Sequence, residues 1–407
     1  MMITAKSTLR VPALFSLKSK LMGTIWDFAH FGFVCYLSSN LKSLGFFFTL
    51  SLSLCLLKQS ISERQRVAFQ IGSVFLLTAV LFRLRAATYF DVSTSLSGFG
   101  LLVNKFATVD LRTLGISYCY LRSVYAITTR QSWTILSFFR YFFFAPTFMS
   151  GPIMTPEDFE LPRAIHSRAW NQDTAYRLAI GSLKLIAASL VLTSIPLVYA
   201  KTFLIIPNGS TYPDQFLYYL AGWPLALLWV GVFFSGLWLF LNFSGFSDLY
   251  IGASMLFGIK PPENFDRPFR SRSITEFWQR WHMSLGVWLR TQCFKPIAIL
   301  GNGVWATRLI APLLTMLVCG AWHGATTSFL TWGAMHGVGL SAHAAWSSLV
   351  RVHLPETVTS HLAYRLFSWI ITHSWIAMSW VFFLPLDNQI GLFTRLHIAA
   401  LLVGIKP

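Results

Sequence analysis

The sequence predicts an all-α protein: a polytopic bundle of transmembrane helices, with re-entrant or interfacial helices among them. Two observations support this class. Of the 407 residues, 55% are hydrophobic and only 12% are charged, whereas an ordinary soluble domain has about 25% charged residues. The apolar residues also gather in long stretches separated by short polar ones. We therefore expect about nine to eleven membrane helices in one integral membrane domain, residues 1–407.

The candidate spans follow one another along most of the chain. A crossing helix needs about 20 mostly apolar residues, because lipid satisfies no backbone hydrogen bond. Such stretches lie at residues 24–40, 43–57, 67–82, 132–150, 176–206, 216–242, 309–321, 327–349, 361–384 and 388–404. Several are shorter than a full crossing, and residues 86–125 are ambiguous. Short apolar segments of this kind can be re-entrant or buried inside a bundle.

The first 22 residues are basic and hold only a brief apolar stretch, residues 11–17. A secretory signal has a longer apolar region followed by small residues at a cleavage site. We therefore interpret residues 1–22 as an uncleaved basic lead-in to the first membrane helix.

The net charge of +17 is a second informative feature. A basic excess in a soluble chain would suggest nucleic acid, but no nucleic-acid motif is present. In a membrane protein, a basic excess marks cytoplasmic loops and contact with anionic lipid headgroups. The longest polar interruption, residues 260–272, carries four basic and two acidic residues. We predict that it is cytoplasmic.

The five cysteines lie far apart, and none has a partner at metal-ligand spacing. We interpret them as small buried residues and predict neither a metal site nor a bound cofactor.

Residues 273–290 predict an unusual helix. Ser273 and Glu276 form a capping-box pattern, and Phe277, Trp281 and Trp288 then recur at helical spacing. A helix rich in indoles and arginines suits the membrane–water boundary or a protein-lined cavity.

Four ionisable residues in apolar surroundings are candidates for function, since such groups are costly in a membrane unless they are paired or face a cavity. They are His282, His323, His336 and Asp248. His323 has small neighbours on both sides, including Gly320, which permit close approach of another helix or of a substrate. A structural role is the alternative for each histidine. For Asp248, a helix-packing or loop-orienting role is preferred over catalysis.

Several motifs occur in a fixed order. They are Gly115-Ile-Ser-Tyr, Ser150-Gly-Pro-Ile, Phe243-Ser-Gly-Phe-Ser-Asp-Leu-Tyr-Ile-Gly, Pro262-Glu-Asn-Phe-Asp-Arg-Pro-Phe, Phe277-Trp-Gln-Arg-Trp-His-Met-Ser-Leu, Gly320-Ala-Trp-His-Gly-Ala and Trp332-Gly-Ala-Met-His-Gly. Together they resemble the membrane-bound O-acyltransferases, specifically the bacterial branch with alginate O-acetyltransferases and D-alanyl transfer proteins. The resemblance covers about residues 115–383.

The resemblance implies a central tunnel lined by two histidines. His323 matches the histidine regarded as catalytic in the family, and His282 matches a second histidine of bacterial members. We predict both as catalytic: His323 as general base, and His282 polarising the acyl carbonyl or holding the thioester. The residues expected to bind substrate are Trp322, Asn264, Arg280, Trp281, Ser284 and His336.

The function predicted in this way is transfer of an acyl group, acetyl by preference, from a cytoplasmic thioester towards a hydroxyl of a cell-envelope or exported polysaccharide. The donor would be acetyl-CoA or an acyl carrier protein. The protein would lie in the bacterial inner membrane, and a periplasmic acyltransferase would be a partner. D-alanyl transfer to a teichoic-acid-like acceptor, or acylation of a small molecule or lipid, are alternatives. A transporter with a histidine relay, or a non-catalytic assembly subunit, belongs to a different class.

Overall fold

The computed structural model describes residues 41–91, 111–148, 150–160, 171–195, 224–301, 303–324, 326–383 and 392–405. Within these ranges the chain is helical and has no β-strand. The chain divides into two compact units, Met1–Ser150 and Gly151–Pro407. The predicted span at residues 24–40 lies outside the described residues.

The first unit contains four described helices. They are α2 (Leu41–Gln59), α3 (Glu63–Asp91), α5 (Leu111–Thr128) and α6 (Ile135–Phe142). The predicted span at residues 132–150 is therefore only a short helix, which begins at the Thr134 cap. The chain turns soon afterwards at Ala145–Thr147, a 3-10 turn that contains a proline, and proline cannot continue a helix.

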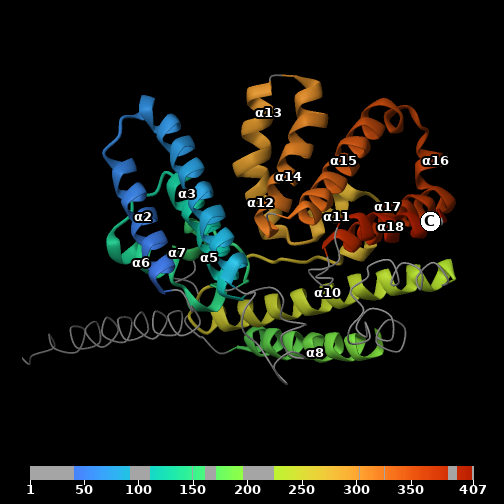
Figure 1. The fold of residues 1–407 in the computed structure, drawn as a ribbon, viewed down its shortest axis with the longest axis horizontal. Helices are drawn as coiled ribbons and strands as arrows, with labels where there is room; N and C mark the ends of the chain where they lie inside the picture. The colour runs from blue at the N-terminus through green and yellow to red at the C-terminus, as the bar shows by residue number, and fades with distance from the viewer. Residues whose placement is uncertain are drawn as a thin grey trace, which may run out of the picture. The chain divides into compact units, whose positions relative to one another are not determined.

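The second unit contains the remaining helices (Figure 1). They are α7 (Pro156–Glu160), α8 (Gln172–Ile195), α10 (Leu225–Met255), α11 (Ile274–Arg280), α12 (Met283–Leu289), α13 (Lys295–Gly301), α14 (Ala311–His323), α15 (Thr327–Leu349), α16 (Glu356–Ser360), α17 (Leu362–Phe383) and α18 (Leu392–Leu402). Two π-helical turns, Arg290–Phe294 and Ala306–Ile310, join α12 to α13 and lead into α14.

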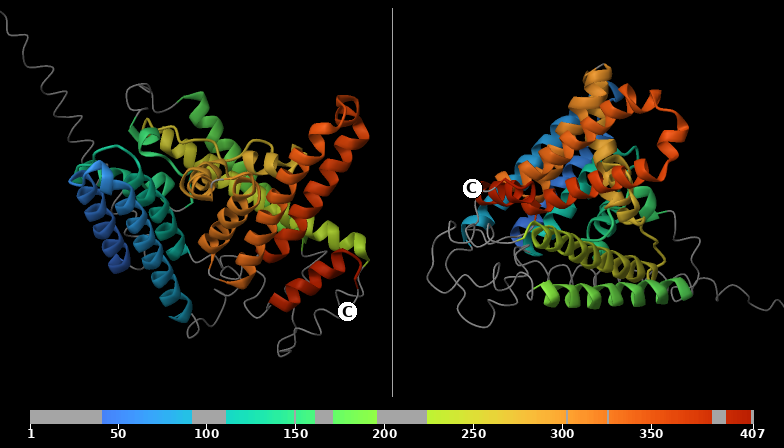
Figure 2. Two further views of the ribbon diagram at one scale, coloured as in Figure 1. Left: turned by 90° about the horizontal axis from the view of Figure 1, so that it is seen from above. Right: turned by 90° about the vertical axis from the view of Figure 1, so that its right-hand side faces the viewer.

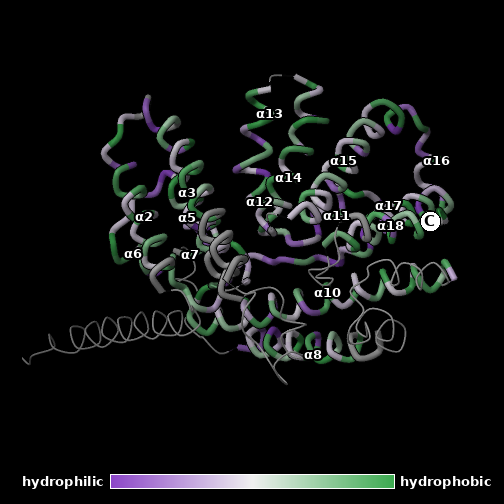
Figure 3. Tube along the Cα trace, in the orientation of Figure 1, coloured by the Kyte–Doolittle hydropathy of each residue, from purple (hydrophilic) through white to green (hydrophobic). Residues whose placement is uncertain are grey.

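Four helices of the described chain are long and apolar enough to cross a membrane. They are Gln172–Val191, Leu225–Met255, Ala306–His323 and Leu362–Phe383, and each overlaps a predicted span. The all-α, multi-pass class is thereby confirmed. Figure 3 shows the contrast along the chain: α10 and α14 are largely hydrophobic, whereas the segment that joins α10 to α11 is hydrophilic.

Helices α8 and α10 lie side by side and antiparallel (Figures 1 and 2), and glycines permit their close contact. A Cβ at Gly181 would lie 2.8 Å from the Gly245 carbonyl oxygen. Asp248, whose side chain is 7% exposed, accepts hydrogen bonds of 2.6 Å from both Arg177 and Lys184 of α8. The structure therefore confirms the helix-packing interpretation of Asp248.

Helices α14 and α15 also meet backbone to backbone. A Cβ at Gly320 would lie 2.3 Å from the Phe329 carbonyl oxygen, and a Cβ at Gly333 would lie 2.3 Å from that of Met316. No larger residue fits at either position without separating the two helices. The predicted close approach of a helix at Gly320 is confirmed, and it brings His323 at the end of α14 beside the first turns of α15.

Candidate active site

The helix predicted over residues 273–290 is broken in the middle, which corrects that prediction. α11 ends at Arg280, α12 begins at Met283, and His282 between them has a left-handed backbone with φ 43°. The reason is a tertiary contact. The Asp266 N–H donates to the Arg280 carbonyl at 2.9 Å, and the Met283 N–H donates to the Asn264 carbonyl, also at 2.9 Å. Residues 260–272, called the polar loop below, thus form hydrogen bonds with the Arg280 carbonyl and the Met283 N–H, which would bond to helix neighbours in a continuous helix.

The left-handed conformation of His282 is a departure from ordinary backbone preferences. A non-glycine residue there costs about 1–3 kcal/mol, and such residues gather at functional sites. Only two non-glycine residues of the described chain have positive φ, Arg267 and His282. Arg267 lies in the polar loop, and His282 lies in the segment to which that loop is hydrogen-bonded. The backbone therefore aims the His282 side chain in a direction that a helix would not allow.

Asn264 is the centre of a buried polar network. Its Nδ2 donates to Ser247 Oγ at 3.0 Å. Its Oδ1 accepts from Ser284 Oγ at 2.6 Å and contacts His282 Nδ1 at 3.3 Å. Ser284 Oγ in turn accepts from the Ile153 N–H at 3.0 Å. Asn264, Ser247, His282 and Ser284 are all buried, so these bonds form out of contact with water.

The Asn264 network assigns the tautomer of His282. Because Asn264 Nδ2 donates to Ser247, Oδ1 is the atom that faces His282 and Ser284. A carbonyl oxygen only accepts, so the proton of His282 is on Nδ1 and Nε2 carries the lone pair. Burial lowers the pKa of His282 to about 3, because burial disfavours the charged imidazolium. His282 is a neutral ring whose Nε2 accepts.

His323, the last residue of α14, lies among aromatic rings. Its ring is 4.7 Å from that of Trp322 and 4.9 Å from that of Phe383, centroid to centroid, with both pairs edge to face. The Trp332 ring is 5.3 Å away at 89°, and the Phe329 ring stacks at 6.1 Å. Trp322, predicted as a binding residue, is thus a direct neighbour of His323. The imidazole is partly exposed and flanked by large apolar surfaces.

His336 has both ring nitrogens engaged. Nδ1 accepts from Trp278 Nε1 at 3.2 Å, so the proton is on Nε2, which donates to Ser379 Oγ at 2.9 Å. Ser379 Oγ in turn donates to the Ile376 carbonyl at 2.6 Å. The chain of donors and acceptors is complete within the protein. This arrangement favours the structural alternative for His336; its predicted contact with substrate stays a prediction.

A continuous set of rings joins the surroundings of the two predicted catalytic histidines. Phe383, which contacts His323, lies 5.6 Å from Trp380. Trp380 lies 5.3 Å from Trp281, the residue before His282. Trp281 is 5% exposed and stacks on Phe277. The predicted tunnel stays a prediction, but one aromatic wall runs from His323 to the residue beside His282.

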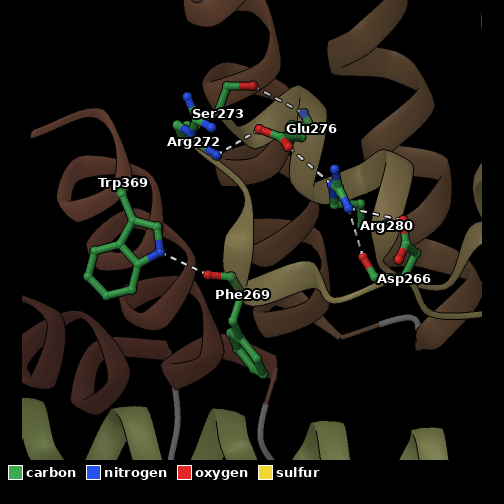
Figure 4. Close-up of polar contacts among 7 residues, drawn as sticks. All are labelled: Asp266, Phe269, Arg272, Ser273, Glu276, Arg280 and Trp369. Carbon is green, nitrogen blue, oxygen red and sulfur yellow. Dashed lines mark hydrogen bonds and ion pairs between the residues drawn. The ribbon is translucent and has the colours of Figure 1, made fainter. Parts of the chain in front are cut away.

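Arg280 holds the polar loop against α11 (Figure 4). Its Nε donates to Glu276 at 3.1 Å, and its Nη1 donates to the Asp266 carboxylate at 3.0 Å. Because both carboxylates are partly exposed, these ion pairs fix geometry more than they add stability. The predicted contact of Arg280 with substrate stays a prediction.

Of the two hydrogen bonds of the predicted capping box at the start of α11, the one to Ser273 is present and the one to Glu276 has a different donor. Ser273 Oγ accepts from the Glu276 N–H at 3.1 Å, whereas the Glu276 carboxylate accepts from the Arg272 N–H at 2.8 Å. On the other side of the loop, Trp369 of α17 donates to the Phe269 carbonyl at 2.8 Å (Figure 4). The loop is therefore held by α11 and by α17.

Sequence reasoning missed three residues of this region: Ser247, Ser379 and Trp332. The sequence could have indicated Ser247, since it stands beside Asp248 in a motif of small and polar residues. Nothing in the sequence indicates Ser379, which lies in an apolar helix. Within the described ranges, no three His, Cys, Asp or Glu side chains come close enough to hold a metal ion.

A comparison with protein families identifies the relationship. The model of the family described as "MBOAT, membrane-bound O-acyltransferase family" matches residues 12–384. The chain belongs to this family. The match begins about a hundred residues before the first recognised motif, so the family relationship also covers most of the first unit.

Three bacterial relatives are similar to this chain over part of their length. A teichoic acid D-alanyltransferase of Streptococcus thermophilus is 33% identical over 58% of this chain and 58% of its own length. A peptidoglycan O-acetyltransferase of Helicobacter pylori is 37% identical over 36% of this chain and 26% of its own. A probable alginate O-acetylase AlgI of Pseudomonas aeruginosa is 37% identical over 40% of this chain and 29% of its own. The aligned part thus spans about three fifths of the first relative and under a third of the other two.

Proposed function

We propose that this protein is a membrane-bound O-acyltransferase of the bacterial inner membrane that moves an acyl group from a cytoplasmic thioester to a hydroxyl, with His323 as general base. The observation that supports it best is the pairing of two histidine motifs within one unit. His323 lies among aromatic rings, and His282 is a neutral ring whose orientation is set by a left-handed backbone. Membership of the family supports the class of reaction.

In the proposed reaction, the acceptor hydroxyl attacks the thioester carbonyl carbon while His323 takes the hydroxyl proton. A C–O bond forms, and the carbonyl electron pair moves onto oxygen. When that pair returns, the C–S bond breaks and the thiolate leaves with the proton from the His323 imidazolium. A well-placed base contributes about 10²–10⁴-fold to such a step, and apolar walls limit hydrolysis of the donor.

The tautomer of His282 favours one of its two predicted roles. Neutral imidazole with the proton on Nδ1 has no free N–H to polarise a carbonyl, because that proton is given to Asn264. Its Nε2 can accept a hydrogen bond. We therefore assign His282 to holding the thioester donor, by accepting at Nε2 from an N–H or O–H that the donor carries, with Asn264 and Ser284 fixing the ring.

The acyl group is proposed to be acetyl and the acceptor a polysaccharide, after the names of the O-acetylating relatives. D-alanyl transfer to a teichoic-acid-like acceptor is the second candidate, since a teichoic acid D-alanyltransferase aligns with 58% of this chain. A carrier-protein donor and a periplasmic partner that completes the transfer belong to the same proposal.

The test compares His323→Ala with the unaltered chain in membranes that hold equal amounts of inserted protein. Each preparation receives [14C]acetyl-CoA, or a D-alanyl carrier protein labelled on the alanyl group, and transfer to membrane-associated hydroxyl acceptors is counted. We expect the variant to lose at least about 10²-fold in rate. Normal turnover by a well-inserted His323→Ala protein would refute the role of the base, and turnover of neither donor by the unaltered chain would refute the function.

A further inference from the structure

Trp332, on α15, has a hydrogen-bond donor that the protein does not use. The side chain is 2% exposed, and its Nε1–H finds no acceptor among the residues that the structure describes. A buried donor without a partner costs about 1–3 kcal/mol. Other indoles of the same unit are satisfied: Trp278 donates to His336, and Trp375 donates to the Met335 carbonyl.

The position of Trp332 makes this unused donor informative. The indole ring contacts the predicted base His323 at 5.3 Å, edge to face, and Phe383 at 4.9 Å. On its own helix it contacts His336 at 4.8 Å. A phenylalanine would also place an apolar aromatic ring here, with less contact area but without burying an N–H. Aromatic packing therefore does not account for the polar Nε1–H at this position.

The helix crossing explains how the indole reaches His323. Gly333, the next residue, lies against the Met316 carbonyl oxygen of α14, where a Cβ would be only 2.3 Å away. This contact brings the α15 backbone against α14 about two turns before His323. Trp332 is consequently fixed beside the imidazole by backbone contact as well as by side-chain packing.

The proposed reaction needs a donor that the nearby histidines do not supply. The carbonyl oxygen gains negative charge as the hydroxyl attacks, and a preorganised donor aimed at that oxygen is a large source of rate acceleration. The Nδ1–H of His282 is given to Asn264, and the Nε2–H of His336 is given to Ser379. The Nε1–H of Trp278 donates its hydrogen bond to His336 Nδ1.

We propose that Trp332 is a further catalytic residue, whose Nε1–H donates a hydrogen bond to the acyl carbonyl oxygen of the thioester bound at His323. The inference rests on the proposed acyl transfer. The donor keeps its proton throughout: its bond to the oxygen shortens as the C–O bond forms and lengthens as the C–S bond breaks. A transition state with charge on that oxygen is thereby stabilised more than the neutral ground state.

The test compares Trp332→Phe with Trp375→Phe in the 407-residue chain. Both changes remove the same atoms, but only Trp375→Phe breaks a hydrogen bond within the protein. Transfer is measured with whichever labelled donor, [14C]acetyl-CoA or D-alanyl carrier protein, the unaltered chain uses. Binding of the matching non-transferable thioether and the thermal unfolding midpoint are measured beside it.

We expect Trp332→Phe to lower kcat by about 10²–10³-fold while the Kd of the thioether stays near that of the unaltered chain. Trp375→Phe should lower the unfolding midpoint at least as much and leave kcat near normal. Normal kcat in Trp332→Phe, beside an inactive His323→Ala, would overturn the role of Trp332 and leave the function standing. Equal losses of kcat and stability in both tryptophan variants would show a structural role and also overturn it. Normal kcat in His323→Ala would refute the base itself.

Discussion

Two buried histidines of the same unit, His282 and His336, differ in how the protein uses their ring nitrogens. His336 lies inside the regular helix α15, and both of its nitrogens have partners within the protein. His282 lies at a break between helices with φ 43°, and the network around it fixes Nδ1 alone. Both side chains are buried: His336 is 0% exposed and His282 is 3% exposed. Burial in an apolar bundle therefore does not distinguish the two histidines; the hydrogen bonds of their ring nitrogens do.

The most direct way to break this comparison is to replace each histidine by asparagine, which tolerates a left-handed backbone. We expect His282→Asn to lower the acyl-transfer rate by about 10- to 100-fold, because Nε2 is lost as a hydrogen-bond acceptor, which is worth about 1–3 kcal/mol. His336→Asn should lower it by less than about tenfold and should reduce stability, because Trp278 and Ser379 lose their partner. Rates are measured in membranes per inserted protein. A larger loss of rate in His336→Asn would reverse the assignment.

A subtler change removes the residue that fixes each ring. In Asn264→Ala, Nδ1 of His282 is no longer held, so the ring can take the other tautomer; we expect kcat to fall about tenfold, the equivalent of about 1.4 kcal/mol. In Ser379→Ala, His336 Nε2–H loses its acceptor, which costs about 1–3 kcal/mol of stability with a near-normal rate. The readouts are kcat and the unfolding midpoint. Equal loss of kcat in the two variants would remove the distinction.

The smallest expected effect concerns the pH dependence of stability. Because the folded protein holds His282 with a pKa of about 3, below the unfolded value of about 6.5, the unfolded chain binds the extra proton. The stabilisation is present above pH 6.5 or so and is lost as pH falls, by up to about 1.4 kcal/mol per pH unit. The unfolding midpoint should fall less steeply between pH 7 and pH 5 in His282→Asn than in the unaltered chain. Parallel slopes would show that His282 is not buried neutral.

In the first unit, helices α2 and α5 also use buried polar groups. Lys58 of α2 donates to the Ala126 carbonyl at 3.0 Å and to that of Thr129 at 2.6 Å. Arg122 of α5 is 1% exposed and donates to the Tyr141 and Phe142 carbonyls. These cations fasten helices and loops by satisfying carbonyl groups at their ends. Charged groups in apolar surroundings thus also need their partners counted before a function is assigned.

The part of the site that sequence predicted is local. Ser273 caps α11, Gly320 lies at a close helix crossing, and Trp322 adjoins His323. Each depends on residues a few positions away or on the absence of a side chain. The break at His282 could not be predicted in this way, since its cause is a loop centred on Asn264, eighteen positions earlier. The helical spacing of the aromatic residues continued straight through it.

From the sequence alone come the class and the family: scarce charge and long apolar stretches require helices in lipid, and the ordered motifs indicate the membrane-bound O-acyltransferases. Tertiary structure alone decided what each histidine can do. The reason is that a tautomer depends on which donor or acceptor faces each nitrogen, and those partners come from separate helices. His282 faces Asn264, His336 faces Trp278 and Ser379, and only the folded chain brings them together.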